Sequence, residues 1–218
     1  MSEIKKGAVL NYTTIILTNV VGLLLTPFII HKLGDAEYGL YTLIGAFVGS
    51  ISIIDFGLND TIVRFIAKYR ASKDKIGEEN FLATTMIIYA FISLTVLIIG
   101  SICYINIENI FEDSLSIEEI GKAKIMFLIL IFNLTISLPG GSFGGICNGY
   151  EAFVFPKTVN IFRYIFRSVT VVGLLLFGGK AVALVILDTI LNMIIIALNA
   201  FYVFKKLEVR FKLHQFEK

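Results

Sequence analysis

Charge is scarce in this sequence. Asp, Glu, Lys and Arg make up only 17% of the residues, against about 25% in an ordinary soluble domain. The net charge of +2 provides no basic excess of the kind that binds nucleic acid, so no nucleic-acid partner is expected. The two cysteines, Cys103 and Cys147, lie in or beside hydrophobic stretches. We therefore expect them to pack as small apolar side chains and not to form a disulfide.

Sequence patterns for catalysis and for metal binding are also lacking. The two histidines, His31 and His214, stand far apart and cannot build a metal site with the two cysteines. The glycine-rich ATP-binding loop that ends in Gly-Lys-Ser or Gly-Lys-Thr does not occur in the sequence. No catalytic constellation is visible, so we expect neither an enzyme nor a cofactor.

Long apolar stretches, in contrast, are abundant. Apolar residues make up 56% of the chain, and the mean hydropathy is +0.83. A bilayer core about 30 Å thick needs about 20 helical residues to cross it. Six stretches have this length: 9–30, 39–63, 81–105, 123–146, 159–178 and 181–204. The sequence therefore predicts an all-α integral membrane protein, with a bundle of about six transmembrane helices over 1–204 and a basic cytoplasmic tail or linker over 205–218.

The distribution of Lys and Arg predicts the orientation of this bundle. One set of ends and loops holds nearly all of these residues, and the other set holds only Lys32, Lys122, Lys124 and Lys180. Positive loops stay in the cytoplasm, so both termini are expected there and the loop over 106–122 is expected outside.

Several polar residues within the predicted spans share helix faces. Asp188 and Asn192 lie on one face of the sixth span, Asn133 lies on a polar face of the fourth, and Asp55 lies on a stripe of the second. We interpret these four as candidates for lining a cavity or binding a coupling ion. For Asp55 an alternative is an interfacial charge cluster that ends the helix.

The fifth span carries two arginines on one face. Arg163 and Arg167 are four residues apart, and Asn160 lies close to the same face. An arginine at mid-span costs about 2.5–3.5 kcal/mol on insertion scales, so another group must offset its charge. One explanation is a bound phosphate, which the planar guanidinium fits well. The other is a buried ion pair with Asp188, and Asp188 alone could also be a protonatable coupling site.

Three short motifs resemble those of a known family. They are 33–41 (LGDAEYGLY), 55–58 (DFGL) followed by Arg64, and 148–153 (NGYEAF). Together they resemble the bacterial polysaccharide flippases for O-antigen and capsule, which belong to the multidrug/oligosaccharidyl-lipid/polysaccharide superfamily. The resemblance covers nearly the whole chain.

This resemblance implies a function. Such proteins flip an undecaprenyl-pyrophosphate-linked oligosaccharide across the bacterial cytoplasmic membrane, by alternating access around a cationic cavity. By analogy, Arg163, Arg167 and Asn160 would bind the pyrophosphate. Family members have about 12–14 spans in two related halves, so this chain resembles the N-terminal half of a MATE-like transporter. A second half or a homodimer is then expected, whether the chain comes from a truncated gene, a fragment or a split transporter.

Two alternative functions stay open at this point. A drug/cation antiporter of the same superfamily would use Asp188 as its acidic site. A non-transporting membrane scaffold would instead organise a polysaccharide assembly complex. In the flippase and scaffold roles the expected partners include membrane lipids, the polyprenyl-pyrophosphate-linked glycan, a polysaccharide polymerase and glycosyltransferases.

Overall fold

The described residues form helices joined by short turns. This computed structural model describes residues 3–51, 53, 57–112 and 114–214. The helices are α1 (Glu3–Leu33), α2 (Asp35–Ile51), α3 (Leu58–Ser72), α4 (Lys75–Ile105), α5 (Ile107–Phe111), α6 (Ile117–Gly149), α7 (Val154–Leu176) and α8 (Ala181–Lys205).

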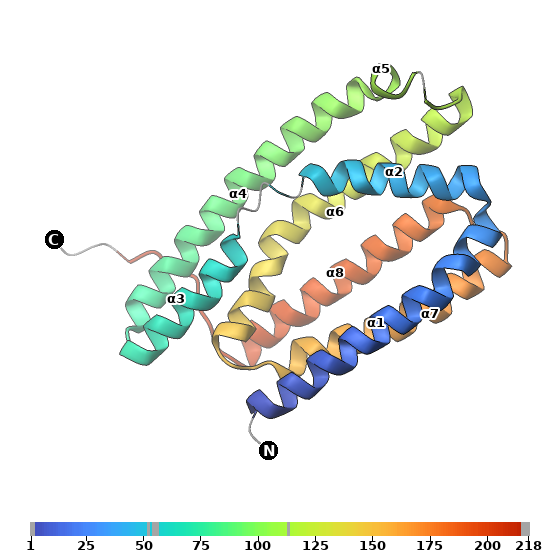
Figure 1. Ribbon diagram of the computed structural model, residues 1–218. Coiled ribbons are helices and arrows are strands. Elements are labelled where there is room, and N and C mark those ends of the chain that lie inside the picture. The colour runs from blue at the N-terminus through green and yellow to red at the C-terminus, as the bar shows by residue number, and fades with distance from the viewer. Residues whose placement is uncertain (1–2, 52, 54–56, 113, 215–218) are drawn as a thin grey trace.

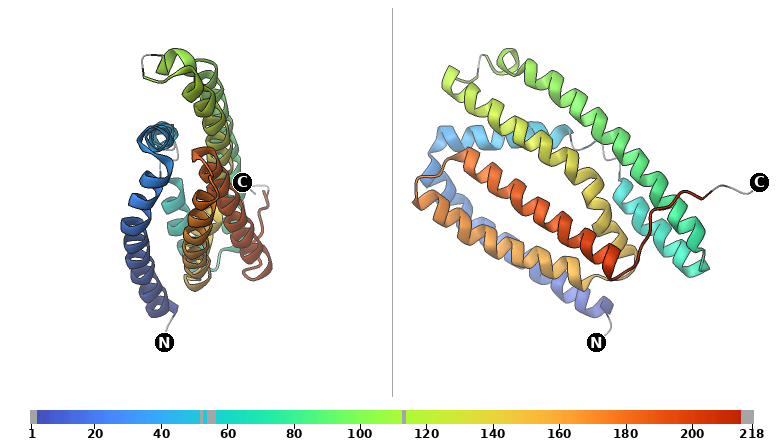
Figure 2. Two further views of the ribbon diagram at one scale, coloured as in Figure 1. Left: turned by 90° about the vertical axis from the view of Figure 1, so that its right-hand side faces the viewer. Right: turned by 180° about the vertical axis from the view of Figure 1, so that it is seen from behind.

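The long helices run alternately up and down the bundle (Figure 1). α1, α4 and α7 run in one direction, and α3, α6 and α8 return in the other. One end of the bundle, which we call the proximal end, therefore contains the start of α1, the α6–α7 turn and the end of α8. We call the opposite end the distal end. Figure 2 shows α1 and α2 on one face of the bundle, with α4, α6 and α8 behind them. α6 is the central helix, because it packs against α2, α3, α4 and α8.

Among the described residues, five helices are long and apolar enough to cross a membrane. They are Val9–Leu33 of α1, Lys75–Ile105, Ile117–Gly149, Val154–Leu176 and Ala181–Lys205. Large apolar side chains on these helices face outward: Leu23 is 76% exposed and Phe162 is 69% exposed. Lipid accommodates such a surface, whereas a soluble protein rarely exposes apolar patches of this extent. The prediction of an all-α integral membrane protein is thus confirmed.

The second predicted span differs from the structure. Residues 39–63 do not form one helix: α2 ends at Ile51 and α3 begins at Leu58. Gly57, directly before α3, has a φ of 73°, a left-handed conformation that glycine adopts without a steric penalty. Both short helices pack against α6, and together they cover the length of the bundle (Figure 1). Asp55, a predicted cavity residue, lies outside the described residues.

Four of the other five predicted ranges lie within one helix each, and 159–178 runs past the end of α7 at Leu176. Glycines let α6 approach its neighbours closely. A Cβ added at Gly140 would lie 2.6 Å from Ile196 of α8, and one at Gly149 would lie 2.8 Å from Ile66 of α3. Small residues allow this close packing of membrane helices. The close packing holds α6 and α8, which carry polar residues described below, in a defined position relative to each other.

Candidate functional site

An ion pair lies where α2, α7 and α8 meet. Both Nε and Nη2 of Arg167 donate to the two carboxylate oxygens of Asp188, and the Nη2–Oδ2 distance is 2.7 Å. Tyr41 of α2 donates a further hydrogen bond to Oδ2 of Asp188, at 3.4 Å. The side chains of Arg167 and Asp188 are each 22% exposed. In this structure Asp188 is therefore the counter-ion of Arg167, as in the ion-pair explanation.

Arg163 remains a cation without a counter-ion within the described part of the chain. It lies one helical turn before Arg167 on α7 and is half-buried. Its side chain contributes to the wall of an apolar groove of about 390 Å³ between α7 and α8, beside Phe162 and Leu191. Asn160 does not join it, because the Nδ2 of Asn160 donates to the carbonyl oxygen of Pro156 in its own helix, at 2.9 Å.

A second polar cluster connects α8 to α6. Nδ2 of Asn192 donates to Oδ1 of Asn133 and to Oγ of Ser137, both at 2.6 Å. Asn192 lies one turn after Asp188 on the same face of α8. The structure thus places three of the four predicted cavity residues in one polar strip on α8 and the facing side of α6: Asp188, Asn192 and Asn133.

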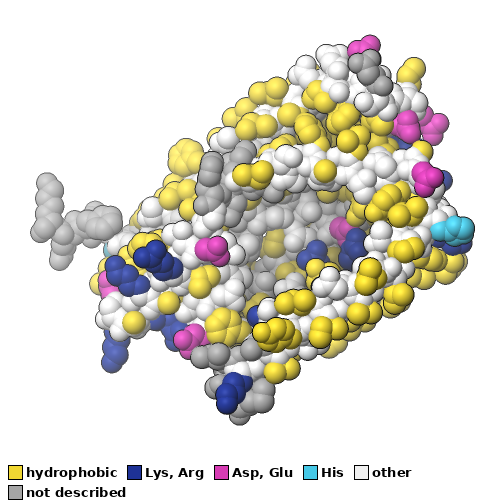
Figure 3. Space-filling view, in the orientation of Figure 1, with side chains coloured by type: hydrophobic (Ala, Val, Ile, Leu, Met, Phe, Trp, Pro, Cys, Tyr) yellow, Lys and Arg dark blue, Asp and Glu magenta, His cyan; other side chains and the backbone are white. Residues whose placement is uncertain are grey.

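The space-filling view shows where this strip could be reached. The surface is hollowed between α1 and α2, and basic and acidic side chains lie inside the hollow, while hydrophobic side chains lie along its rim (Figure 3). We call this feature the central hollow. The ion pair links α2 to α8 and α7, the helices that border the hollow.

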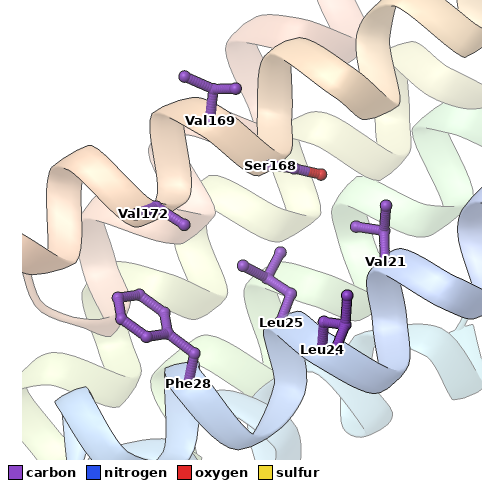
Figure 4. Close-up of a pocket in the computed structure, with 7 residues that line it drawn as sticks. All are labelled: Val21, Leu24, Leu25, Phe28, Ser168, Val169 and Val172. Atoms are coloured by element: carbon purple, nitrogen blue, oxygen red, sulfur yellow. The ribbon is translucent and has the colours of Figure 1, made fainter.

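A separate groove runs between α1 and α7 (Figure 4). Its volume is about 520 Å³, and its lining residues are Val21, Leu24, Leu25, Phe28, Ser168, Val169 and Val172. Six of these seven side chains are apolar. The groove is therefore suited to a hydrocarbon chain and not to a sugar or a phosphate.

The family assignment follows from a match over almost the entire length. The model of the polysaccharide biosynthesis protein family matches residues 4–218. The chain belongs to this family. The predicted resemblance to a family of bacterial polysaccharide membrane proteins is confirmed at the level of this family.

A relative of this chain occurs in Bacillus subtilis (strain 168). It is EpsK, described as an uncharacterized membrane protein, and it is 24% identical over 202 residues. The match covers 90% of the present chain but 39% of EpsK, so the chain spans well under half the length of this relative. No solved structure matches the chain. The long apolar helices and the bacterial membrane-protein relative together identify a multi-pass membrane protein.

The motif over 33–41 connects three helices at the distal end. Gly34, with a φ of 79°, separates α1 from α2. Glu37 then accepts from Nζ of Lys122 on α6 at 3.1 Å and from the backbone N–H of Ala181 at the start of α8, at 3.2 Å. Because Tyr41 lies one turn after Glu37 on α2, the same motif also reaches Asp188. Sequence reasoning missed the roles of Glu37 and Tyr41, and the motif itself was the available signal.

The motif over 148–153 forms a corresponding connection at the proximal end. The hydroxyl of Tyr150 donates to the carboxylate of Glu78 on α4, and Glu78 is only 5% exposed. The guanidinium of Arg70 stacks 4.5 Å from the centre of the Tyr150 ring. Burial and the neighbouring Glu78 raise the pKa of Tyr150 above its ordinary value, so the phenol remains a hydrogen-bond donor at neutral pH. The chain after α8 also binds here, because His214 contacts Glu79 at 2.6 Å.

Proposed function

We propose that this protein flips an undecaprenyl-pyrophosphate-linked oligosaccharide from the inner to the outer leaflet of the bacterial cytoplasmic membrane, as one half of a transporter. The proposal refines the family role in polysaccharide biosynthesis. In this role the protein transports and does not catalyse. Both termini would lie in the cytoplasm, in accord with the distribution of Lys and Arg.

The observation that carries the proposal is the charge balance of α7 and α8 near the middle of the bundle. Arg163 and Arg167 contribute two positive charges and Asp188 contributes one negative charge. An uncompensated cation at this depth is unfavourable and marks a site for an anion or for ion transport. A pyrophosphate supplies several oxygens for guanidinium groups and would complete the balance. We therefore assign the headgroup to Arg163 first, with Arg167 next to it.

The apolar groove between α1 and α7 offers a place for the polyprenyl chain. Among its lining residues, Ser168 follows Arg167 directly on α7, and Val172 lies five residues after Arg167. A lipid with its headgroup at the arginines could therefore lay its isoprenoid units along the same helix. In this arrangement the polyprenyl chain stays in contact with the membrane lipids, while the protein shields the charged headgroup from them.

Transport needs a second bundle. Alternating access moves one bundle against another around a shared site, and the helices that border the central hollow belong to one bundle. The second bundle would be the remainder of a longer protein, a separate chain or a second copy. Glycosyltransferases would supply the lipid-linked glycan, and a polymerase would consume it.

The antiporter alternative fits the site less well. Asp188 already accepts hydrogen bonds from Arg167 and Tyr41, and a cationic drug would have to compete with a guanidinium held in bidentate fashion. A cation is also repelled by Arg163 on the same face.

The test is binding of a short-chain lipid-linked sugar. The protein in nanodiscs of uncharged phospholipid is titrated with farnesyl-pyrophosphoryl-N-acetylglucosamine, and farnesol serves as the uncharged comparison. Loss of a charge-assisted hydrogen bond typically costs about 1.5–3 kcal/mol, so Arg163→Gln should weaken binding about ten-fold or more. Arg210→Gln, which removes an exposed cation beyond α8, is the matched control. Equal affinities for all three proteins, or for both ligands, would refute the proposal and favour the scaffold role.

A further inference from the structure

The carboxylate of Asp188 accepts hydrogen bonds from the two N–H groups of Arg167 that an anionic headgroup would need. Nε and Nη2 of the guanidinium, which form the fork that binds a carboxylate or phosphate, both donate to Asp188. A pyrophosphate must therefore displace this carboxylate or find it neutralised. Resting on the function proposed above, we propose that headgroup binding is coupled to the uptake of one proton by Asp188.

The surroundings of Asp188 contain few other charges. α8 packs against α2, α6 and α7. The charged, titratable or hydrogen-bonding groups that these helices present around the pair are Tyr164 and Arg167 of α7, Tyr38 and Tyr41 of α2, and Asn133 and Ser137 of α6, the last two through Asn192. Arg163 lies one helical turn from Arg167 on α7. Farther toward the distal end, Glu37 and Lys122 neutralise each other at 3.1 Å. Asp188 is therefore the carboxyl group that can change the charge at this place.

The charge balance decides which state of Asp188 accompanies the headgroup. Each phosphate of a pyrophosphate diester carries one negative charge at neutral pH. With Asp188 ionised, the two arginines would face three negative charges; with Asp188 protonated, two cations face two anions. An excess charge is unfavourable in a low-dielectric region, so the filled site favours the protonated carboxyl. Tyr41 can continue to donate to the neutral group, which keeps Asp188 in position.

Two consequences follow from thermodynamic linkage. Affinity for the headgroup should fall as the pH rises, because fewer protons are available for Asp188. Conversely, binding should draw a proton from solution, and release of the lipid should return it. Arg167 then alternates between two anions, its own carboxylate in the empty state and the headgroup in the loaded state.

The experiment measures affinity and proton uptake on the full chain in nanodiscs. Farnesyl-pyrophosphoryl-N-acetylglucosamine is titrated between about pH 6 and pH 8, where uptake of one proton changes the dissociation constant by up to about ten-fold per pH unit. Calorimetry in buffers of different ionisation enthalpy gives the number of protons taken up, which we expect to approach one.

Asp188→Asn removes the titrating group. It should bind the probe more tightly than the native protein at the alkaline end, with an affinity that is independent of pH and with no proton uptake. Asp60→Asn, an exposed acid of α3, should keep the native pH dependence. If Asp188→Asn does not fold, proton uptake by the native protein decides the question alone.

The outcomes distinguish a failure of this inference from a failure of the proposed function. Binding that requires Arg163 but shows no pH dependence and no proton uptake would overturn the inference and leave the proposed function standing. A native pH dependence in Asp188→Asn would overturn the inference as well. No binding at any pH would overturn both.

Discussion

Tyr150, at the end of α6, donates its hydroxyl hydrogen bond to the carboxylate of Glu78 near the start of α4. Because Glu78 is buried, Tyr150→Phe should leave a carboxylate without its donor, which typically costs about 1–3 kcal/mol. We expect a lower midpoint of thermal unfolding in detergent, whereas Tyr12→Phe, at a residue that is 68% exposed, should have no effect. A midpoint equal to that of the native protein would show that this bond does not stabilise the α6–α7 turn.

The same bond predicts a pH dependence. The pKa of Tyr150 is raised by burial and by Glu78, so the folded state holds the phenolic proton more firmly than the unfolded state. Stability should be constant with respect to this group below about pH 10, the ordinary tyrosine pKa, and should fall above it as the unfolded chain ionises. The difference in unfolding midpoint between the native protein and Tyr150→Phe should therefore shrink above about pH 10. A constant difference would contradict the assignment.

The Arg167–Asp188 pair should show strong coupling in a double-mutant cycle. Breaking a buried pair by removing one partner typically costs about 3–5 kcal/mol; because each side chain here is 22% exposed, we expect about 1–3 kcal/mol for Arg167→Gln. Adding Asp188→Asn should recover much of the loss, since it removes the unpaired carboxylate. Additive effects in the four proteins, measured by thermal unfolding without ligand, would show that the two residues act independently.

Continuous apolar stretches made most of this fold predictable. α4 and α8 follow from hydropathy alone, because a run of about 20 apolar residues has few other stable forms in a membrane. The interruption between α2 and α3 does not follow in this way. Gly57 lies in a stretch whose hydropathy resembles that of a span, and hydropathy carries no information about φ.

The site was predictable in part for a similar reason. Helical periodicity places Arg163 and Arg167 on one face of α7, and it places Asp188 and Asn192 on one face of α8. Which partner satisfies Arg167 depends on how α7 and α8 are rotated against each other, which the sequence does not state. Tyr41 lies 147 positions from Asp188 in the chain, so no local pattern connects them.

Glu37 should stabilise the distal end more than its exposed neighbour Glu118. Glu37 is 10% exposed, accepts from Lys122 and also receives the N–H of Ala181, whereas Glu118 is 82% exposed. Glu37→Gln loses the charge but can still accept one hydrogen bond, so we expect a destabilisation of about 1–2 kcal/mol. Glu118→Gln should change stability by less than about 0.5 kcal/mol. Equal unfolding midpoints for the two variants would argue against a structural role for the first motif.

The last prediction concerns the orientation of the bundle in the membrane. The proximal end carries most of the Lys and Arg residues, so it should face the cytoplasm. The test uses single cysteines introduced at Asp74, Glu112 and Glu208 in a variant with Cys103→Ala and Cys147→Ala. In intact cells a membrane-impermeant maleimide should label position 112 only, because Glu112 follows α5 at the distal end, while Asp74 lies in the α3–α4 turn and Glu208 lies beyond α8. All three residues are exposed, so differences in labelling report sidedness, and permeabilised cells should label all three. External labelling at position 74 would invert the orientation. It would then place the Tyr150–Glu78 end outside, where lipid-linked sugars are delivered instead of loaded.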